Sequence, residues 1–196
     1  MAVLIEGETV LLRDFEPSDL DVYISWMVND GIWKRYDAPW EEQPEWNEQT
    51  RQMYADRFTG YCSDRSVPRR RVGIVVKDGC RLIGWVNRYA VDLHPDACMV
   101  GLDICVDGVL GRGYGSEALV LWVDHLFSQS EFHRIGLATY SFNVAMQRVA
   151  EKSGFTLEGR EREIRFWDGE WIDRLTYGLL REEWDLVKRA SCSSHP

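Results

Sequence analysis

Residues 101–118 read GLDICVDGVLGRGYGSEA, and an amphipathic run continues from them to Phe127. This pattern predicts an apolar strand that ends in a glycine-rich turn, from which a helix begins. Such a turn directs backbone N–H groups and the positive end of the helix dipole at an anion. Glycines at 111, 113 and 115 keep side chains out of the way. The sequence therefore indicates a site for a phosphorylated cofactor, and the alternative is a tight connection that binds nothing.

Two familiar phosphate motifs do not fit this turn. The dinucleotide fingerprint requires G-x-G-x-x-G spacing, whereas Gly111, Gly113 and Gly115 alternate. A P-loop requires Gly-Lys followed by Ser or Thr, and the sequence contains no such tripeptide. The class of cofactor has to be inferred from the residues that follow the turn.

A second strand and helix follow at residues 134–141 and 142–155, with Asn143 as the helix N-cap and Gly154 just past the helix end. Together with the glycine turn, this strand–helix–Gly-Phe unit resembles the GNAT superfamily of acetyl-CoA-dependent N-acetyltransferases. The resemblance extends from about Leu4 to Trp184. It is strongest to the ribosomal-protein N-terminal acetyltransferase (RimJ/RimL-like) branch, which shares features with the stretches 26–30, 149–155 and 168–173.

The predicted elements form one α+β domain over residues 1–186, followed by a flexible C-terminal tail at 187–196. The resemblance implies the GNAT-type acyl-CoA N-acyltransferase fold, a central mixed, mostly antiparallel sheet flanked by helices. The Asp78-Gly79 pair predicts a tight hairpin turn. Strands are expected at 10–15, 72–76, 82–89, 134–141, 156–166 and 171–180, and a further strand begins after a turn at 94–96 and includes 101–106. Helices are expected at 18–27, at about 46–58, from the glycine turn to Phe127, and at 142–155.

The resemblance implies acetyl-CoA as cosubstrate, with no metal, and assigns residues to it along its length. Ile104, Cys105 and Val106 would lie along the acetyl group, where a backbone N–H can stabilise an oxyanion. Asn143 would reach the pantetheine arm, and Arg148 or Lys152 the phosphate-bearing adenosine end, although a solvated helix face is the alternative for these two. The pyrophosphate would be held by the amides of Leu110, Gly111, Arg112, Gly113, Tyr114, Gly115 and Ser116.

The chain departs from the family at the positions that handle protons. Many members carry a tyrosine four residues before the glycine of the Gly-Phe pair, and this chain has Ala150 there. The serine and glutamate of the ribosomal-protein branch fall on Met146 and Arg165. The candidates that remain are Asp103, Glu163 and Asp173 as bases, with His94 a weaker one, and Tyr140 and Ser141 as proton relays. For Glu163 and Asp173 the alternative is pairing with nearby arginines.

The acceptor site is expected in the stretch richest in aromatic and acidic residues. Trp33, Tyr36 and Trp40 stand there beside Glu41, Glu42 and Glu45. Aromatic faces with carboxylates nearby suit a cationic amine. The alternative is that the tryptophans anchor the N-terminal helices to the sheet.

Composition narrows the class of protein. The net charge of −9 over 196 residues argues against a nucleic-acid partner. The five cysteines lack the spacing of a zinc site, and no stretch has the length and apolarity of a membrane span. We therefore expect a cytoplasmic protein, monomer or homodimer, that binds neither nucleic acid nor membrane.

The hypothesis is an N-acetyltransferase that transfers acetyl from acetyl-CoA to a primary amine, either of a small molecule or of a protein N-terminus, by direct attack in a ternary complex. The alternative is a catalytically weak module that binds acetyl-CoA as a sensor or scaffold. The missing tyrosine, serine and glutamate motivate this second hypothesis.

Overall fold

A computed structural model describes residues 3–36, 38–91 and 94–192, which divide between two compact units. The first unit comprises Met1–Asn87 and Leu102–Trp122, and the second comprises Arg88–Gly101 and Val123–Pro196. Strands β4 (Arg81–Val91) and β5 (His94–Ile104) and helix α3 (Tyr114–Gln129) contribute residues to both units. The two units are described in turn.

The sheet of the first unit places its strands in the order β1-β2-β3-β4-β5. Strands β1 (Val3–Glu6), β2 (Val10–Arg13), β3 (Arg71–Val76) and β4 pair antiparallel with their neighbours. The β3–β4 hairpin turns at η3 (Asp78–Cys80), where Gly79 has φ +75°. The hairpin predicted from Asp78-Gly79 is therefore confirmed.

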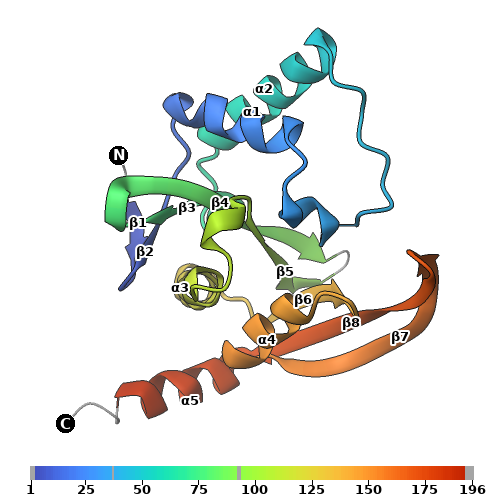
Figure 1. Cartoon of the computed structure of the whole chain (residues 1–196). Coiled ribbons are helices and arrows are strands. Elements are labelled where there is room, and N and C mark those ends of the chain that lie inside the picture. The colour runs from blue at the N-terminus through green and yellow to red at the C-terminus, as the bar shows by residue number, and fades with distance from the viewer. Residues whose placement is uncertain (1–2, 37, 92–93, 193–196) are drawn as a thin grey trace. The chain divides into compact units, whose positions relative to one another are not determined.

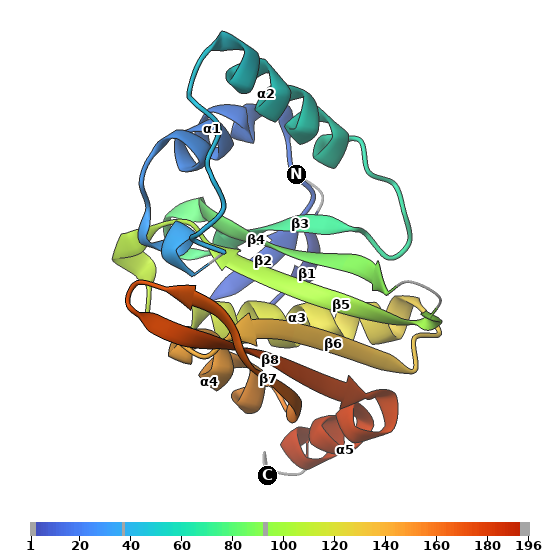
Figure 2. The same cartoon turned by 90° about the vertical axis from the view of Figure 1, so that its right-hand side faces the viewer.

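Helices α1 (Leu20–Val28) and α2 (Glu48–Cys62) lie beside each other over one face of this sheet (Figures 1 and 2). Asn47 caps α2 through a hydrogen bond from the Thr50 N–H to its Oδ1, 3.0 Å long. The short helices η1 (Pro17–Asp19), η2 (Ile32–Arg35) and η4 (Asp107–Val109) complete the unit. Asp107 accepts a hydrogen bond from the Ile32 N–H at 3.0 Å and so ties the η2 segment to the end of β5.

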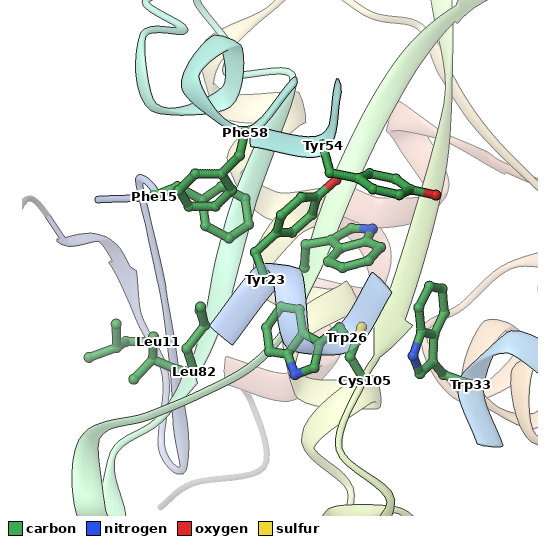
Figure 3. Close-up of a cluster of buried hydrophobic side chains, with 11 residues drawn as sticks. Leu11, Phe15, Tyr23, Trp26, Trp33, Tyr54, Phe58, Leu82 and Cys105 are labelled. Atoms are coloured by element: carbon green, nitrogen blue, oxygen red, sulfur yellow. The ribbon is translucent and has the colours of Figure 1, made fainter. Parts of the chain in front are cut away.

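An aromatic cluster fills the space between the two helices and the sheet (Figure 3). Tyr23 of α1 packs on Phe58 of α2 with ring centroids 5.0 Å apart, and Trp85 of β4 lies among Tyr23, Trp26 and Trp33 at 5.6–6.2 Å. Burial of this much aromatic surface is the main stabilising contribution of the face. The cluster consists of Leu11, Phe15, Tyr23, Trp26, Trp33, Tyr54, Phe58, Val75, Leu82, Trp85 and Cys105.

The second unit contains the first part of β5, then β6 (Arg134–Tyr140), β8 (Glu170–Leu180) and β7 (Thr156–Trp167). Strand β6 is parallel to β5 and antiparallel to β8, and β7 and β8 form the long closing hairpin (Figure 2). The parallel β5–β6 register runs from Ala97–Arg134 to Val100–Leu137, whereas β6 stays paired with β8 as far as Tyr140. Helices α4 (Val144–Lys152) and α5 (Arg181–Cys192) complete this unit.

Arg181 fastens α5 to the second unit. Its guanidinium donates to the backbone oxygens of Phe127, Ser130 and Phe132 at 2.7–2.8 Å and lies 5.0 Å from the Phe127 ring. Trp184 is buried and its indole N–H donates to Asp124. These contacts explain why residues 187–192, which the sequence assigned to a flexible tail, are helical; residues 193–196 of that segment lie outside the described residues.

The α+β class and the mixed, mostly antiparallel sheet flanked by helices are confirmed. The elements absent from the prediction are β1, the short 3-10 helices and α5, and β5 begins at His94, so that the segment 94–96, expected as a turn, is already part of the strand. The segments that were missed are short or polar, so that hydrophobic periodicity marks them weakly. No helix within the described ranges is both long and apolar enough to cross a membrane.

Candidate functional site

The glycine turn lies in the first unit, between the end of β5 and helix α3. Gly111 and Gly113 have φ of +75° and +86°, and a Cβ at either position would meet no atom within 4 Å. Both conformations favour glycine, since an L side chain is strained at positive φ. Residues 110–113 are exposed, so the backbone of the turn is open to an approaching ligand.

Helix α3 presents free amides directly after the turn. Its first intrahelical hydrogen bond runs from the Glu117 N–H to the Gly113 oxygen at 3.1 Å, so the N–H groups of residues 114–116 precede it and have no acceptor inside the helix. Gly115 serves packing, because its Cβ would stand 3.2 Å from Cδ2 of Leu102. Two of the three glycines thus leave the backbone of the turn open, and the third allows α3 to pack closely on β5; the anion site at this turn stays a prediction.

The strand before the turn presents its amides in alternate directions. The Cys105 N–H donates to the Ile83 oxygen of β4 at 2.7 Å and is therefore engaged within the sheet. Consecutive N–H groups of a strand point to opposite edges, so those of Ile104 and Val106 point away from β4. Of the three residues predicted along the acetyl group, these two present the amides that can reach an oxyanion, while Cys105 packs its side chain into the aromatic cluster.

The other predicted cofactor residues lie on α4 in the second unit. Asn143 is 9% exposed and caps the helix by accepting the Met146 N–H on Oδ1 at 3.0 Å. The cap uses the amide oxygen, which leaves the Nδ2 group as a hydrogen-bond donor for a ligand. Arg148 and Lys152 are exposed and four residues apart, so they share one face of α4. Ala150, at the position of the family tyrosine, is fully buried.

Asp173 is held by its neighbours in the second unit. Its Oδ1 accepts the Glu163 N–H at 2.8 Å, and its Oδ2 forms an ion pair with Arg160. The Glu163 backbone N–H and the Arg160 guanidinium hold the pKa of this carboxyl below its ordinary range. Such a carboxylate is a poor proton acceptor at neutral pH, so the geometry favours the pairing alternative for Asp173.

The remaining proton-handling candidates divide between the two units. Ser141 also contacts Asp173, through the backbone of that residue. Its Oγ accepts the Asp173 N–H at 3.1 Å, and its own N–H donates to the Asp173 backbone oxygen at 2.9 Å. Tyr140 stacks on Phe142 with centroids 5.8 Å apart. Glu163 is exposed, at a bulge in β7 with φ +54°, and His94 is exposed at the start of β5. Asp103 lies half-buried on β5 in the first unit, two residues before Cys105 and therefore on the same face of the strand.

The aromatic residues predicted for the acceptor site divide by burial. Trp33 is 9% exposed and packs edge-on to Trp85 at 5.6 Å between ring centroids, as the anchoring alternative requires. Tyr36 is exposed and Trp40 is half-buried. The carboxylates Glu41, Glu42 and Glu45 are exposed. The predicted stretch therefore contributes one ring to the core and leaves its acids in solvent.

Two residues that the sequence analysis did not select lie at this aromatic cluster. The Arg71 guanidinium is 4.5 Å from the Tyr61 ring centroid and 4.9 Å from that of Trp85. Within residues 3–36, 38–91 and 94–192, the buried Trp85 Nε1 has no hydrogen-bond partner. The β3–β4 register could have revealed the pair, because the Asp78-Gly79 turn brings these two strands together. Isolated arginine and tryptophan residues in strands carry no motif of their own.

Comparison with known proteins identifies relatives along most of the chain. The family model described as acetyltransferase (GNAT) domain matches residues 9–156. The SPbeta prophage-derived uncharacterized N-acetyltransferase YokL of Bacillus subtilis (strain 168) is 26% identical over 186 residues, which cover 92% of this chain and 94% of that protein.

Solved structures share the fold. Spermidine N-acetyltransferase from Vibrio cholerae in complex with CoA and spermine has a TM-score of 0.72 at 21% identity, covering 91% of this chain and 99% of that one. Ribosomal-protein-S5-alanine acetyltransferase from Vibrio fischeri has a TM-score of 0.68 at 21% identity, covering 92% of this chain and 97% of that one. The fold inferred from the glycine turn and the strand–helix–Gly-Phe unit is thus confirmed.

Proposed function

We propose, from the premise that this chain belongs to the GNAT family of acetyltransferases and is an acetyl-CoA-dependent N-acetyltransferase, that it acetylates a primary amine by direct attack in a ternary complex. The observation that carries the proposal is the exposed glycine turn at the start of α3, where positive φ at Gly111 and Gly113 opens the backbone and the amides of residues 114–116 are unpaired within the helix. A main-chain cradle of this kind suits a pyrophosphate.

The cofactor residues follow from this assignment. Amides from Leu110 to Ser116 would hold the pyrophosphate of acetyl-CoA, Nδ2 of Asn143 would donate to the pantetheine arm, and Arg148 or Lys152 would meet the phosphate at the adenosine end. The capping role of the Asn143 oxygen supports its part, because the cap fixes the orientation in which the nitrogen is presented. No metal is required by this chemistry, since the thioester is already activated.

The reaction needs a neutral amine, positioning and an oxyanion donor. The amine nitrogen attacks the thioester carbonyl, and the N–H groups of Ile104 and Val106 are the donors we assign to the oxygen of the tetrahedral intermediate. The C–S bond then breaks, and coenzyme A leaves as a thiolate. The amine loses its proton to Asp103 through water, and the thiolate takes a proton from solvent because Ala150 offers none.

The acceptor is a small-molecule amine or a protein N-terminus. The printed names of the structural relatives include an enzyme for spermidine and one for the alanine of ribosomal protein S5. Met146 and Arg165, at the positions that carry the serine and glutamate of the RimJ/RimL-like branch, favour a small molecule for this chain. We place the protein in the cytoplasm, as a monomer or homodimer without a nucleic-acid or membrane partner.

Acetyl transfer is tested by thiol release. The full chain is incubated with acetyl-CoA and a panel of primary amines, and the coenzyme A formed is measured together with the acetylated product. Release that depends on one class of amine is the expected result. Tight acetyl-CoA binding by calorimetry with no thiol release for any amine or N-terminal peptide would instead support the sensor or scaffold alternative.

A further inference from the structure

The register of the β3–β4 hairpin places an arginine beside a tryptophan on the helix-covered face of the first unit. Arg71 is paired with Asn87 and Gly73 with Trp85. Arg71 and Trp85 are therefore diagonal neighbours on one face of the hairpin, within reach of long side chains. Gly73 has no side chain, so the Trp85 indole is not displaced by a cross-strand partner.

The Arg71 guanidinium contacts aromatic rings and no acid. It lies over the rings of both Tyr61 and Trp85, whereas the ion pairs of the first unit use Arg13, Arg69 and Lys77. Arg71 forms no ion pair with any carboxylate of the described residues. A guanidinium that stacks on aromatic faces keeps its in-plane N–H groups directed outward, in the fork that matches a carboxylate or phosphate.

The Trp85 indole supplies a second, independent observation. The residue is 4% exposed, and its Nε1 has no hydrogen-bond partner in the part of the chain that the structure describes. A buried indole N–H normally has an acceptor, and one without it needs an explanation. Its neighbour Trp33, 9% exposed and 5.6 Å away between ring centroids, likewise has an Nε1 without a hydrogen-bond partner among the described residues. Two adjacent buried indoles thus each present an N–H donor that no described residue accepts.

The donors adjoin the strand assigned to the acetyl group. Cys105 belongs to the same buried cluster as Trp85, and Val106 packs against that cluster. A group held by Arg71 and Trp85 would therefore lie on the same face of the sheet as the Cys105 side chain. Cys105 stands between Ile104 and Val106, whose N–H groups we assign to the oxyanion. The exposed acids Glu41, Glu42 and Glu45 do not offset the charge of Arg71 by any ion pair among the described residues.

We propose that Arg71 and Trp85 bind an oxyanion of the acceptor, so that the substrate is an amine that also carries a carboxylate or a phosphate. This inference rests on the proposed function and narrows its substrate class. Protonated polyamines carry positive charge, which Arg71 would repel, and their N–H groups are donors, which the indole N–H cannot pair with. The site thus favours an amino acid or an aminoalkyl phosphate over a simple alkylamine or a polyamine.

Matched acceptors test the proposal. β-Alanine and tyrosine are compared with ethylamine and tyramine, their decarboxylated counterparts, and O-phosphoethanolamine distinguishes phosphate from carboxylate. We expect kcat/KM to be at least about 10-fold higher for the acidic member of each pair, with most of the difference in KM, because the contact is made in the ground state. Spermidine serves as the acceptor that should be disfavoured.

Three variants locate the effect. Arg71→Gln should bring the acid-to-amine preference close to 1, and Trp85→Phe should lower it partly, since the ring stays and the N–H is lost. Arg70→Gln is the matched control: Arg70 is the adjacent, exposed arginine, and its loss should leave the preference unchanged. Thermal unfolding reports whether each variant folds. If Arg71→Gln does not fold, the acid-to-amine preference of the wild-type protein decides the test.

Binding separates this inference from the proposed function. β-Alanine and ethylamine are titrated against the protein loaded with coenzyme A, followed by tryptophan fluorescence. Arg71-dependent binding of β-alanine without acetylation of any amine would support the oxyanion site and count against acetyl transfer to such amines. Equal or better use of ethylamine and spermidine, a preference that survives Arg71→Gln, or no binding of β-alanine would overturn the inference and leave acetyl transfer standing on its own assay.

Discussion

The glycine turn and the aromatic cluster, both in the first unit, present different kinds of group to a ligand. The turn offers only main-chain amides, opened by positive φ at Gly111 and Gly113. At the cluster the groups are side chains: Arg71 of β3 stacks on Trp85 of β4 and on Tyr61 of α2, which packs against the cluster. A main-chain site depends on contiguous residues and on backbone conformation. A side-chain site depends on strand register and helix packing, so the two should respond differently to substitution.

The largest effect is expected at Asp103, a side chain on the cluster face of β5. Asp103→Asn should lower kcat by roughly 100-fold, the lower end of what a positioned base contributes. Steady-state rates over a range of pH measure this, and the loss should be smaller at high pH, where more of the amine is neutral. Asp107→Asn is the control: that carboxylate supports the Ile32 N–H, so its loss should alter thermal stability more than kcat. An unchanged kcat for Asp103→Asn would assign the proton to water alone.

The main-chain site is tested by Gly113→Val. A β-branched residue is strained at φ +86°, by about 2 kcal/mol, so the amides should move and coenzyme A affinity should fall about 30-fold. Calorimetry measures the affinity. Gly108→Val is the matched control for Gly113→Val. A Cβ at Gly108 likewise meets no described atom within 4 Å, but the φ of Gly108 is not in the positive range. Equal affinities for the two variants would argue against a phosphate cradle at the turn.

Asn143 is expected to serve both helix capping and coenzyme A binding with one side chain. Asn143→Ala should destabilise the protein by about 1 kcal/mol through the lost N-cap and also weaken coenzyme A binding. Asn143→Ser keeps a capping oxygen and removes the Nδ2 donor, so it should bind coenzyme A more weakly with little change in stability. Chemical denaturation and calorimetry together resolve the two roles. Wild-type affinity in Asn143→Ser would restrict Asn143 to capping.

The smallest effect concerns Asp173, whose side chain serves structure. Its folded pKa lies below the ordinary value of about 3.9, so its stabilising contribution is fully present above that pH and is lost as pH falls through the lowered folded pKa. Asp173→Asn should therefore be less stable than wild type at neutral pH, and the difference should shrink below about pH 4. Denaturation at a series of pH values measures it. A difference independent of pH would exclude the carboxylate charge as its cause.

Much of the fold followed from local pattern. The Asp78-Gly79 turn and the Asn143 cap are short-range features whose partners lie a few residues away, and each is where the pattern predicted it. Helix α5 was missed because its first residues, Arg181 to Asp185, are mostly polar, and its position is fixed by Arg181 reaching backbone oxygens about fifty residues earlier. Periodicity within a segment contains no information about such a contact.

The candidate site shows the same limit. Sequence alone determined the glycine turn, the acidic composition and the departures at Ala150, Met146 and Arg165, because each is a property of neighbouring residues or of the whole count. Only the tertiary structure decided that Cys105 donates its N–H within the sheet, that Asp173 is held by Arg160 and the Glu163 amide, and that Arg71 stacks on Trp85. Hydrogen bonding, burial and charge depend on which residues the folded chain brings together, and that is set by register and packing across the whole unit.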